Sequence, residues 1–530
     1  MRSAVKSRLR PQYSGNGGSV SKEQHEVASP QPEAPEVNQT LAVEEKKTQA
    51  TLLVEAATSV ELFHTPERVV YGSVLVRGHR ETYALNSSGF REWLALKFYI
   101  KNGRPPHEQA VKDAIGVLKA KAMFVGKEHE VSVRLSGTGD AVFIDLGDED
   151  WRVLQIDASG IRVSAGASVK FRRPKGMLSL PLPAESGSLD DLRPFVNLRD
   201  DDQWRLLVAW LLGAMAPTGP YPILEITGEQ GSAKSTLSKL LRGLLDPNSA
   251  PARATITKER DLMIAATNGR VLVFDNVSRL SAELSDALCR ISTGGGFSVR
   301  TLYENADETL FEAELPIILN GIEDISHRPD LLERTIVLDL PVLTPGQRRD
   351  EQQFWADFEA AKPAILRGLY EAVRSALQNR PLVAGAKWPR MADFAKWVTA
   401  AESALGWTTG AFLESYERNR TEANTRILER DGLAEALIQL AGKGEPWEGT
   451  ATELLAVLRS PGMDHNPDLP RSPNALSGGL RRITPSLRSL GVSIEFHRKG
   501  HASQKVIRLR PISEFTDRTD RTDREEPLAA

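Results

Sequence analysis

The stretch from Tyr221 to Leu245, YPILEITGEQGSAKSTLSKLLRGLL, constrains the fold of this chain more than any other. A short apolar run with β propensity, residues 222–226, enters a turn that contains glycine. An amphipathic helix follows, and its leucines share one face at Leu237, Leu240, Leu241 and Leu244. The order strand, loop, helix predicts a parallel α/β unit whose loop binds phosphate.

The loop GEQGSAKS matches the nucleotide-binding pattern G-x-x-x-x-G-K-[ST] at every fixed position except one, where Ala233 replaces glycine. Gly228 permits a backbone turn that side chains would block, and amide N–H groups at the helix N-terminus can hold phosphate oxygens. Lys234 would place its charge on the β- and γ-phosphates, and the Ser235 hydroxyl would coordinate Mg²⁺. Alanine is the smallest substitute for glycine, so we expect the variant loop to be tolerated. The predicted nucleotide-binding residues are Gly228, Glu229, Gln230, Gly231, Ser232, Ala233, Lys234, Ser235 and Thr236.

Two later apolar runs end on polar residues that suit the same site. Residues 271–274 are typical of a buried parallel strand and end on Asp275, whose carboxylate can reach Mg²⁺ through water. Residues 315–319 end on Asn320, whose amide can hydrogen-bond the attacking water or the γ-phosphate, although Asn-Gly is also a simple turn dipeptide. Arg334 precedes another strand and could act across a subunit boundary as an arginine finger, although a surface arginine is usually only solvated.

The segments GEQGSAKS, VLVFDN, ISTGGGFSVR, LPIILN and DLLERTIVLDLP together resemble the AAA+ ATPase core of superfamily-three replicative helicases, especially the phage, plasmid and prophage type. The resemblance covers residues 195–345. It implies a ring, commonly of six subunits, that hydrolyses ATP between protomers and pulls DNA through its centre. It also implies the catalytic set, which is Lys234, Asp275, Asn320 and Arg334, with Ser235 and Asp275 on the metal side.

Three further points follow from this resemblance. The family places a DNA-contacting hairpin at ISTGGGFSVRTLYENADETLFEA, which makes Arg300 a candidate DNA contact, although a surface loop would have the same composition. Family members often carry a second acidic residue after the position of Asp275, whereas this chain has Asn276. The group that activates the attacking water therefore stays open, with Asp275 and Glu229 as the alternatives.

Composition and charge narrow the function classes. The chain has 530 residues, 41% of them hydrophobic, which suggests about three or four structural units with sizeable cores. The net charge of -3 means that any nucleic-acid site must be a local basic patch. The single cysteine, Cys289, excludes a disulfide framework, and its apolar helical surroundings favour a packed core thiol. No run of about 18 apolar residues occurs, so we expect a cytoplasmic protein without a membrane partner.

Patterning predicts the fold class as multidomain α/β, with an α+β N-terminal module, a helical linker and a C-terminal winged helix, and the resemblance implies that the P-loop core is of the AAA+ type. Residues 1–62, rich in Ser, Pro, Gln and Glu, are expected to be a disordered tail. The remaining predicted parts are an α+β module at 63–183, the ATPase core at 190–345, a helical lid or linker at 346–440, a winged helix at 445–511 and a second disordered tail at 512–530.

An acidic cluster in the N-terminal module could be imagined as the metal site of a polymerase or primase. It consists of Asp145, Asp148, Glu149 and Asp150. Its position between two strand-like runs, beside Gly147, favours a solvated hairpin turn instead. We therefore expect no primase activity within this chain.

Positive charge gathers in the C-terminal part. A helix TATELLAVLRS, helices that begin at Ser472-Pro473 and Thr484-Pro485, and strands VSIEFHR and KVIRLR predict a winged helix. The local basic excess is typical of a protein that binds the DNA backbone, although a protein-binding winged helix could carry the same face. The candidate DNA contacts here are Arg481, Arg482, Arg488, Arg498 and Lys499.

The sequence thus predicts an ATP-dependent DNA helicase or translocase of a phage, prophage or plasmid replication system. Its expected partners are single-stranded or forked DNA, further copies of itself in a ring of about six, and a primase or other replication proteins. The alternative is an ATP-controlled DNA-binding regulator or defence switch with little unwinding activity, to which Asn276 gives weight. A P-loop metabolite kinase is disfavoured by the winged-helix pattern.

Overall fold

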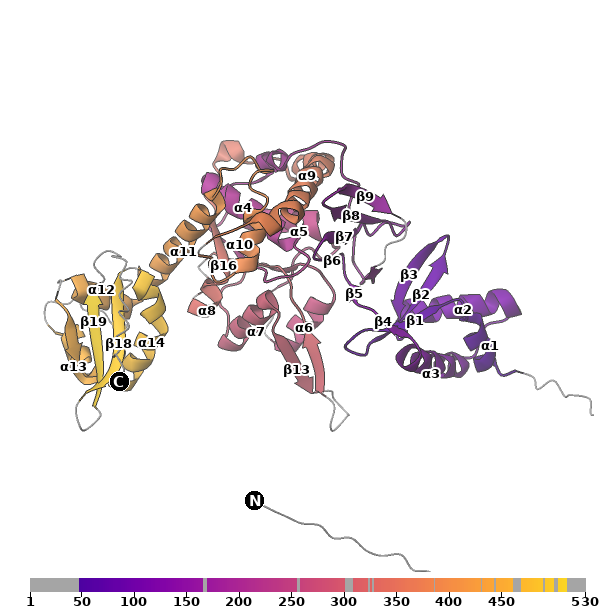
Figure 1. The fold of residues 1–530 in the computed structure, drawn as a ribbon, viewed down its shortest axis with the longest axis horizontal. Helices are drawn as coiled ribbons and strands as arrows, with labels where there is room; N and C mark the ends of the chain where they lie inside the picture. Colours follow the sequence, from indigo (N-terminus) through magenta and orange to yellow (C-terminus); the bar gives the residue numbers. More distant parts are fainter. Residues whose placement is uncertain are drawn as a thin grey trace, which may run out of the picture. The chain divides into compact units, whose positions relative to one another are not determined.

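The computed structural model describes residues 47–164, 169–254, 258–300, 308–322, 325–326, 328–385, 387–429, 431–442, 445–460, 469–489, 491–499 and 504–511. These residues form a mixed α/β protein with several hydrophobic cores and both parallel and antiparallel sheets (Figure 1). We predicted two disordered tails, at residues 1–62 and 512–530. Residues 1–46 and 512–530 lie outside the described residues. Among the described helices, none combines the length and apolar composition that a membrane crossing requires.

The N-terminal module packs three helices on a four-stranded sheet of order β3-β2-β1-β4. Its elements are α1 (Gln49–Ala56), β1 (Glu61–His64), β2 (Val70–Val76), β3 (His79–Ala84), α2 (Ser88–Asn102), α3 (Glu108–Phe124) and β4 (Lys127–Glu128). Our expectation of disorder up to residue 62 is wrong for α1 and β1. The reason is that Leu53 of α1 is fully buried in the same core as Phe90 and Trp93, so this short helix is held by packing.

The second half of the predicted α+β module belongs to a different core. It forms an antiparallel sheet of order β6-β7-β8-β9, from β6 (Leu135–Thr138), β7 (Ala141–Asp145), β8 (Val153–Asp157) and β9 (Gly160–Ser164). The short strands β5 (Val131–Ser132) and β10 (Lys170–Phe171) pair with each other in parallel. One face of the larger sheet, with Val142, Ile144, Leu154 and Ile156, packs into the main core of the chain. Residues 63–183 are therefore not one module with one core.

The acidic turn between β7 and β8 is a hairpin, as predicted, but Asp145 is not solvated. Its side chain is 1% exposed and accepts hydrogen bonds from Arg173, at 2.6 Å from Nη2 and 2.9 Å from Nε. No group of three or more His, Cys, Asp or Glu in the described part of the chain could hold a metal ion. Asp145 ends a strand beside the main core, and the cation of Arg173 compensates its burial.

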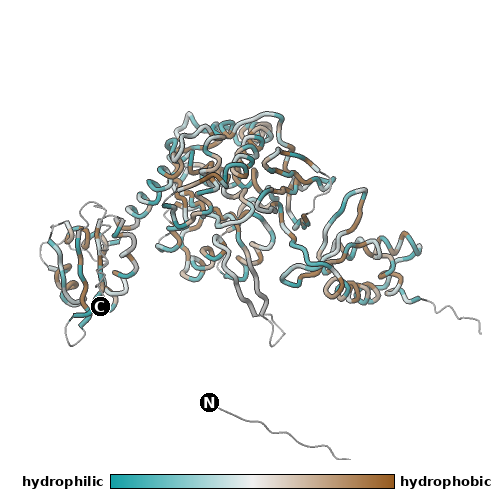
Figure 2. Tube along the Cα trace, in the orientation of Figure 1, coloured by the Kyte–Doolittle hydropathy of each residue, from teal (hydrophilic) through white to brown (hydrophobic). Residues whose placement is uncertain are grey.

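The centre of the chain is a parallel sheet of order β12-β15-β11-β16, flanked by helices. Its strands are mostly apolar and almost entirely buried, as is typical of parallel strands, and Figure 2 shows hydrophobic residues gathered in this region. The elements are η1 (Leu189–Phe195), α4 (Asp201–Ala214), β11 (Ile223–Thr227), α5 (Lys234–Leu245), α6 (Glu259–Thr267), β12 (Leu272–Phe274), α7 (Ala282–Thr293), β15 (Ile317–Asn320), α8 (Pro329–Leu332) and β16 (Thr335–Asp339). Cys289 is buried in α7, which confirms a packed thiol.

An antiparallel hairpin lies in the chain between α7 and β15, where the resemblance predicted one. It consists of β13 (Gly296–Arg300) and β14 (Glu308–Glu312), with Arg300 opposite Glu308. The residues between them, 301–307, lie outside the described ranges.

The region after the central sheet is helical, as predicted. It contains η2 (Pro345–Gln347), α9 (Glu351–Asn379), η3 (Arg380–Leu382), α10 (Ala392–Thr399) and α11 (Ala411–Glu429). Asn419 of α11 accepts a hydrogen bond from the Val337 N–H at 3.0 Å and donates one to the Val337 carbonyl at 2.7 Å. Because Val337 lies in the edge strand β16, this amide satisfies backbone groups that the sheet leaves open.

The C-terminal part has its own hydrophobic core and a sheet of order β17-β19-β18. Its elements are α12 (Gly432–Gly442), β17 (Trp447–Gly449), α13 (Ala451–Leu458), α14 (Pro473–Ser489), β18 (Val492–Lys499) and β19 (Gln504–Pro511). We assigned α12 to the helical linker, and the structure corrects this. Leu433, Leu437 and Leu440 of α12 are buried in the C-terminal core.

The two helices predicted to begin at Pro473 and Pro485 are one helix, α14, which continues through Pro485. A proline inside a helix removes one backbone hydrogen bond and costs about 3 kcal/mol. The helix persists because Leu476, Leu480 and Ile483 recur at helical spacing and are buried in the same core. The signal at Pro485 was therefore overridden by tertiary packing.

One buried ion pair joins the sheet β6–β9 to the main core. Arg134 is fully buried, and its Nε donates to Asp246 Oδ1 at 3.3 Å, while Nη1 donates to the Asp145 carbonyl at 2.8 Å. Asp246 directly follows α5 and also accepts from the Arg270 N–H at 2.9 Å. The carboxylate of Asp246 thus connects three separate segments of the chain.

We predict that Arg134→Met destabilises the protein by about 3 kcal/mol, because it removes the closer of the two buried guanidinium groups beside the Asp246 carboxylate, at 3.3 Å against 3.9 Å for Arg242. Urea unfolding followed by tryptophan fluorescence measures this loss. The matched control is Arg152→Met, which removes a half-exposed ion pair with Asp148 and should cost less than about 1 kcal/mol. Equal stabilities of the two variants would contradict a structural role for the buried pair.

Candidate functional site

The carboxyl ends of β11, β12 and β15 meet at one edge of the central sheet, next to the loop of residues 228–233. The first turn of α5 brings Ser235 to this edge, and its Oγ donates a hydrogen bond to Asp275 Oδ1 at 2.9 Å. Asp275 directly follows β12. The structure therefore brings together the hydroxyl and the carboxylate that the sequence predicted as a pair.

The backbone of the loop explains its glycines. Gly228 has φ of +140°, and a Cβ at this position would lie 2.6 Å from the Leu340 carbonyl oxygen. Gly231 has φ of +87°. Ala233 has φ of +69° and ψ of +25°, a left-handed conformation that costs an L-residue about 1 kcal/mol or more. The position where the motif usually has glycine thus keeps the conformation that glycine favours.

Lys234 lies across the loop. Its Nζ donates hydrogen bonds to the carbonyl oxygens of Gly228 at 2.7 Å and Glu229 at 2.8 Å. Partial burial lowers the pKa of Lys234, and the negative charge of Asp275 opposes this shift. Ser232 is fully buried and donates to the Glu229 carbonyl at 2.9 Å, whereas the side chains of Glu229 and Gln230 are exposed. The loop therefore holds one ammonium group between its own carbonyls.

Asn320 is 1% exposed and its amide is held on both sides. Its Nδ2 donates to Ser238 Oγ of α5 at 2.9 Å, and its Oδ1 accepts from the Asn276 N–H at 2.9 Å. A simple exposed turn asparagine would lack these contacts. Asn320 links α5, which begins at the loop, to the chain segment that leaves β12.

The backbone conformation at Asn276 suits asparagine. Its φ of +58° lies in the left-handed region, which asparagine adopts more readily than most residues with side chains. Its N–H is bonded to Asn320. Position 276 thus shapes the backbone beside the site.

Arg334 lies at the opposite end of the sheet. Its carbonyl accepts from the N–H of Ile223, the first residue of β11, whereas the loop begins after Thr227 at the other end of this strand. The length of β11 separates the two places by roughly 13 Å. The Arg334 side chain is 15% exposed and donates to the Asp330 carbonyl at 2.6 Å. The structure therefore does not bring Arg334 to the loop of its own chain.

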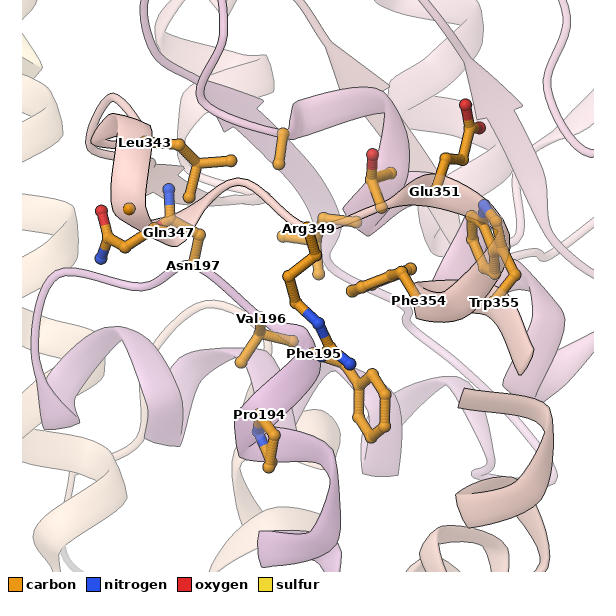
Figure 3. A pocket seen from close by; sticks show the side chains of 14 residues that line it. Pro194, Phe195, Val196, Asn197, Leu343, Gln347, Arg349, Glu351, Phe354 and Trp355 are labelled. Atoms are coloured by element: carbon orange, nitrogen blue, oxygen red, sulfur yellow. The ribbon is translucent and has the colours of Figure 1, made fainter. Parts of the chain in front are cut away.

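A cavity of about 590 Å³ opens beside the loop, and the sequence analysis missed it. The guanidinium of Arg349 lies 5.7 Å from the ring centroid of Phe195 and 5.4 Å from that of Phe354. Figure 3 shows how these side chains line the cavity. Ala233, Thr236 and Leu237 join it to the loop, and the other lining residues are Pro194, Val196, Asn197, Leu343, Gly346, Gln347, Glu351 and Trp355. Most of the lining residues come from two segments, one before and one after the central sheet in the sequence. No local motif therefore marks them.

The predicted DNA contacts lie apart from this site. Arg481 and Arg488 are exposed on α14, and Arg498 and Lys499 are exposed on β18, whereas the side chains of Arg300 and Arg482 lie outside the described part. Lys499 Nζ donates to Glu448 Oε1 at 2.7 Å. Hydrogen bonds from Lys499 and Arg508 lower the pKa of Glu448 to about 2. Lys499 is thus already engaged in an ion pair.

Two family descriptions match parts of this chain. Residues 189–420 match the family described as actinomycete integrative conjugative element replication protein. Residues 433–523 match the one described as AICE RepA C-terminal domain. The second match begins within α12. The first buried residue of the C-terminal core, Leu428, lies five residues before this start. The chain is therefore similar to replication proteins of a mobile element, which supports a replication-related role.

Solved structures similar to this chain include two of the NrS-1 C-terminal region. Both are 12% identical and cover 88% of this chain, with TM-scores of 0.38 and 0.37, and the match spans 100% and 99% of those chains. A JCV helicase bound to a small molecule is 14% identical over 42% of this chain and 66% of that chain, with a TM-score of 0.21. No curated protein matches the sequence.

We predict that Ala233→Gly stabilises the protein by about 1 kcal/mol, because glycine adopts the left-handed conformation without the Cβ penalty. Differential scanning calorimetry or denaturant unfolding measures the gain. The matched control is Ala360→Gly on the exposed side of α9, where the same substitution should destabilise by about 0.5–1 kcal/mol. A loss of stability at both positions would argue against the left-handed backbone at residue 233.

Proposed function

We propose that this chain is an ATP-driven DNA helicase or translocase that acts in the replication of a mobile genetic element. The observation that carries the proposal is the meeting of Ser235, Asp275 and Asn320 beside a loop that holds Lys234. In this proposal the central region is an AAA+ P-loop ATPase of the superfamily-three type. The order α12-β17-α13-α14-β18-β19 supports our proposal that the C-terminal part is a winged helix. The family matches to replication proteins support the biological setting.

The residues at the sheet edge fit the phosphates of ATP and a magnesium ion. Lys234 is a cation held at the mouth of the loop, and it can exchange the carbonyls of Gly228 and Glu229 for phosphate oxygens. The Ser235 hydroxyl and the Asp275 carboxylate, 2.9 Å apart, are oxygen ligands of the kind that Mg²⁺ prefers. Bound Mg²⁺ would neutralise charge on the phosphates as the bond to the γ-phosphate breaks.

The cavity beside the loop is the place for the base and ribose of the nucleotide. It continues from Thr236 at the start of α5, so a phosphate chain on the loop would lead into it. Phe354 and the guanidinium of Arg349 provide flat surfaces for a base, and Asn197 and Gln347 provide hydrogen-bonding groups. Its volume of about 590 Å³ is in the range of small-molecule sites.

Asn320 would orient the attacking water. Its amide is fixed by Ser238 and by the Asn276 N–H, so it can act without reorganisation when the site is filled. An amide adds no negative charge next to the phosphates. Asn276 cannot accept the proton of the water, and Asp275 and the exposed Glu229 are the two carboxylates near the loop that we consider for this role.

Arg334 would complete the site of a neighbouring copy. Arg334 lies at the far end of β11 and cannot reach the loop of its own chain. In a ring, the Arg334 end of one subunit would face the loop end of the next subunit. The Nε of Arg334 is buried without a hydrogen-bond partner in the described residues. We propose that this arginine stabilises the charge that develops on the neighbour's γ-phosphate.

A second candidate function is an ATP-controlled DNA-binding switch with little unwinding. The observation that favours it is Asn276. An acidic residue at this position would give a second carboxylate beside Asp275, and this chain lacks it. Steady-state ATPase assays with and without single-stranded DNA separate the two functions. Turnover that DNA stimulates supports the motor, and slow turnover that ignores DNA supports the switch.

We predict that Lys234→Ala lowers ATP affinity and abolishes ATP hydrolysis, because it removes the cation that the loop holds for the phosphates. Binding of a fluorescent ATP analogue and phosphate release measure the two effects. The control is Lys239→Ala, which removes the same charge from α5 without touching the loop and should leave both values within about twofold. Hydrolysis that survives Lys234→Ala would exclude this site.

We predict that Arg334→Ala preserves ATP binding but lowers turnover by about 10³-fold or more. Mixing Arg334→Ala with Lys234→Ala subunits should restore part of the activity, because some interfaces then combine an intact loop with an intact arginine. Native mass spectrometry with a nonhydrolysable ATP analogue tests the assembly itself. A monomer under all conditions, or mixtures without any recovered activity, would remove the role of Arg334 in a neighbour's site.

A further inference from the structure

The C-terminal core leaves a cleft of about 570 Å³ between α14 and the strands β18 and β19. The cleft contains one large aromatic side chain, Phe496, and three cationic ones, which are Arg481, Arg498 and Lys505. An aromatic ring among cations is a combination that protein cores avoid and that nucleic-acid sites use.

Phe496 continues the apolar face of β18 past the end of the core. Side chains two residues apart in a strand share a face, so Val492, Ile494 and Phe496 point the same way. Val492 and Ile494 are 5% and 4% exposed, whereas Phe496 is 40% exposed. Gly478 of α14 also lines the cleft, and a Cβ added there would meet no atom within 4 Å. The helix therefore supplies no side chain at Gly478 that could cover the ring.

The charges are arranged around this ring. The guanidinium of Arg481 lies 5.4 Å from the Phe496 ring centroid. Arg498 is the register partner of Lys505, so two cations stand directly opposite each other on the face that carries Phe496.

On the other face of the same strands, two cations pair with a carboxylate. Glu448 of β17 accepts hydrogen bonds from Lys499 at 2.7 Å and from Arg508 at 2.6 Å. Lys499 and Arg508 have the opposite strand parity to Arg498 and Lys505. The chain therefore places a carboxylate against the cations that point away from the cleft.

We propose that this cleft binds single-stranded DNA, with one unstacked base against the Phe496 ring and the flanking phosphates on Arg498 and Lys505. A duplex is a poorer occupant, because its base faces are already stacked and cannot reach a ring inside a cleft. The inference rests on the proposed function only in taking DNA as the polymer. It goes beyond that function by assigning strand type and contact residues to the C-terminal part.

The test is fluorescence anisotropy of the full chain, without nucleotide, against a labelled oligothymidine and a labelled duplex of the same length. Phe496→Leu should raise the Kd for the single strand about 5- to 100-fold and leave the Kd for the duplex unchanged. Phe496→Tyr should restore tight binding, since it keeps an aromatic ring. The matched control is Phe124→Leu, which removes a ring that is 80% exposed at the end of α3 and should change neither Kd.

Two further variants separate the effect of the cleft's positive charge on DNA binding from the effect of its open space. Arg498→Gln combined with Lys505→Gln should reduce the slope of log K against log salt by about 1.4, the value for two phosphate contacts on a single strand. Gly478→Leu should fill the open side of the cleft and weaken single-strand binding, while thermal unfolding shows that the domain stays folded.

Single-strand binding that survives both Phe496→Leu and Gly478→Leu would overturn the cleft assignment alone. An equal loss for the single strand and the duplex would also overturn it, because the ring would then act through the surface and not through an unstacked base. A wild-type chain that binds neither DNA would overturn the DNA part of the proposed function as well. The ATP site, measured separately through Lys234, would be untouched by that result.

Discussion

The register of the parallel central sheet is the constraint on which the candidate site depends. Because β11, β12 and β15 run in the same direction, the residues that end them meet at one edge. Ile226 of β11 is paired with Asn320, and Phe274, next to Asp275, is paired with Leu319. A shift of any strand by one residue would turn these side chains to the other face of the sheet and separate them. The fold thus sets the distance between Ser235 and Asp275 before any ligand binds.

The same register keeps two of the predicted site residues of one chain apart. Parallel strands put the loop at one end of β11 and Arg334 at the other, so the fold of one chain holds the two groups apart. If Arg334 contributes to hydrolysis, it does so from a second copy. Assembly and catalysis would then be linked by geometry. Asn320 donates a hydrogen bond to Ser238 and accepts one from the Asn276 N–H, and these two bonds fix its side chain at the edge of the sheet.

The mistaken predictions share a physical origin. Pro485 is a strong local signal for a helix end, yet the buried leucines of α14 outweigh it. Asp145 has the composition of an exposed turn, yet the fold brings the guanidinium of Arg173 to it from 28 residues away. Leu53 sits near a tail of low complexity, yet it is buried in the core of the N-terminal module. In each case a contact distant in sequence overrides the local preference, and local patterns carry no information about such contacts.

The sequence by itself determined the elements whose signal is local. These are the strand, loop and helix around Lys234, the apolar strands that end at Asp275 and Asn320, and the helices that follow the sheet. Periodicity and motif spacing act over a few residues, so one chain suffices to recognise them. Tertiary structure alone decided what depends on separate segments meeting: the cavity lined by Phe195, Arg349 and Phe354, the left-handed backbone at Ala233 and Asn276, and the cleft around Phe496. Those features arise from packing between elements, whose geometry is fixed only when the whole core is assembled.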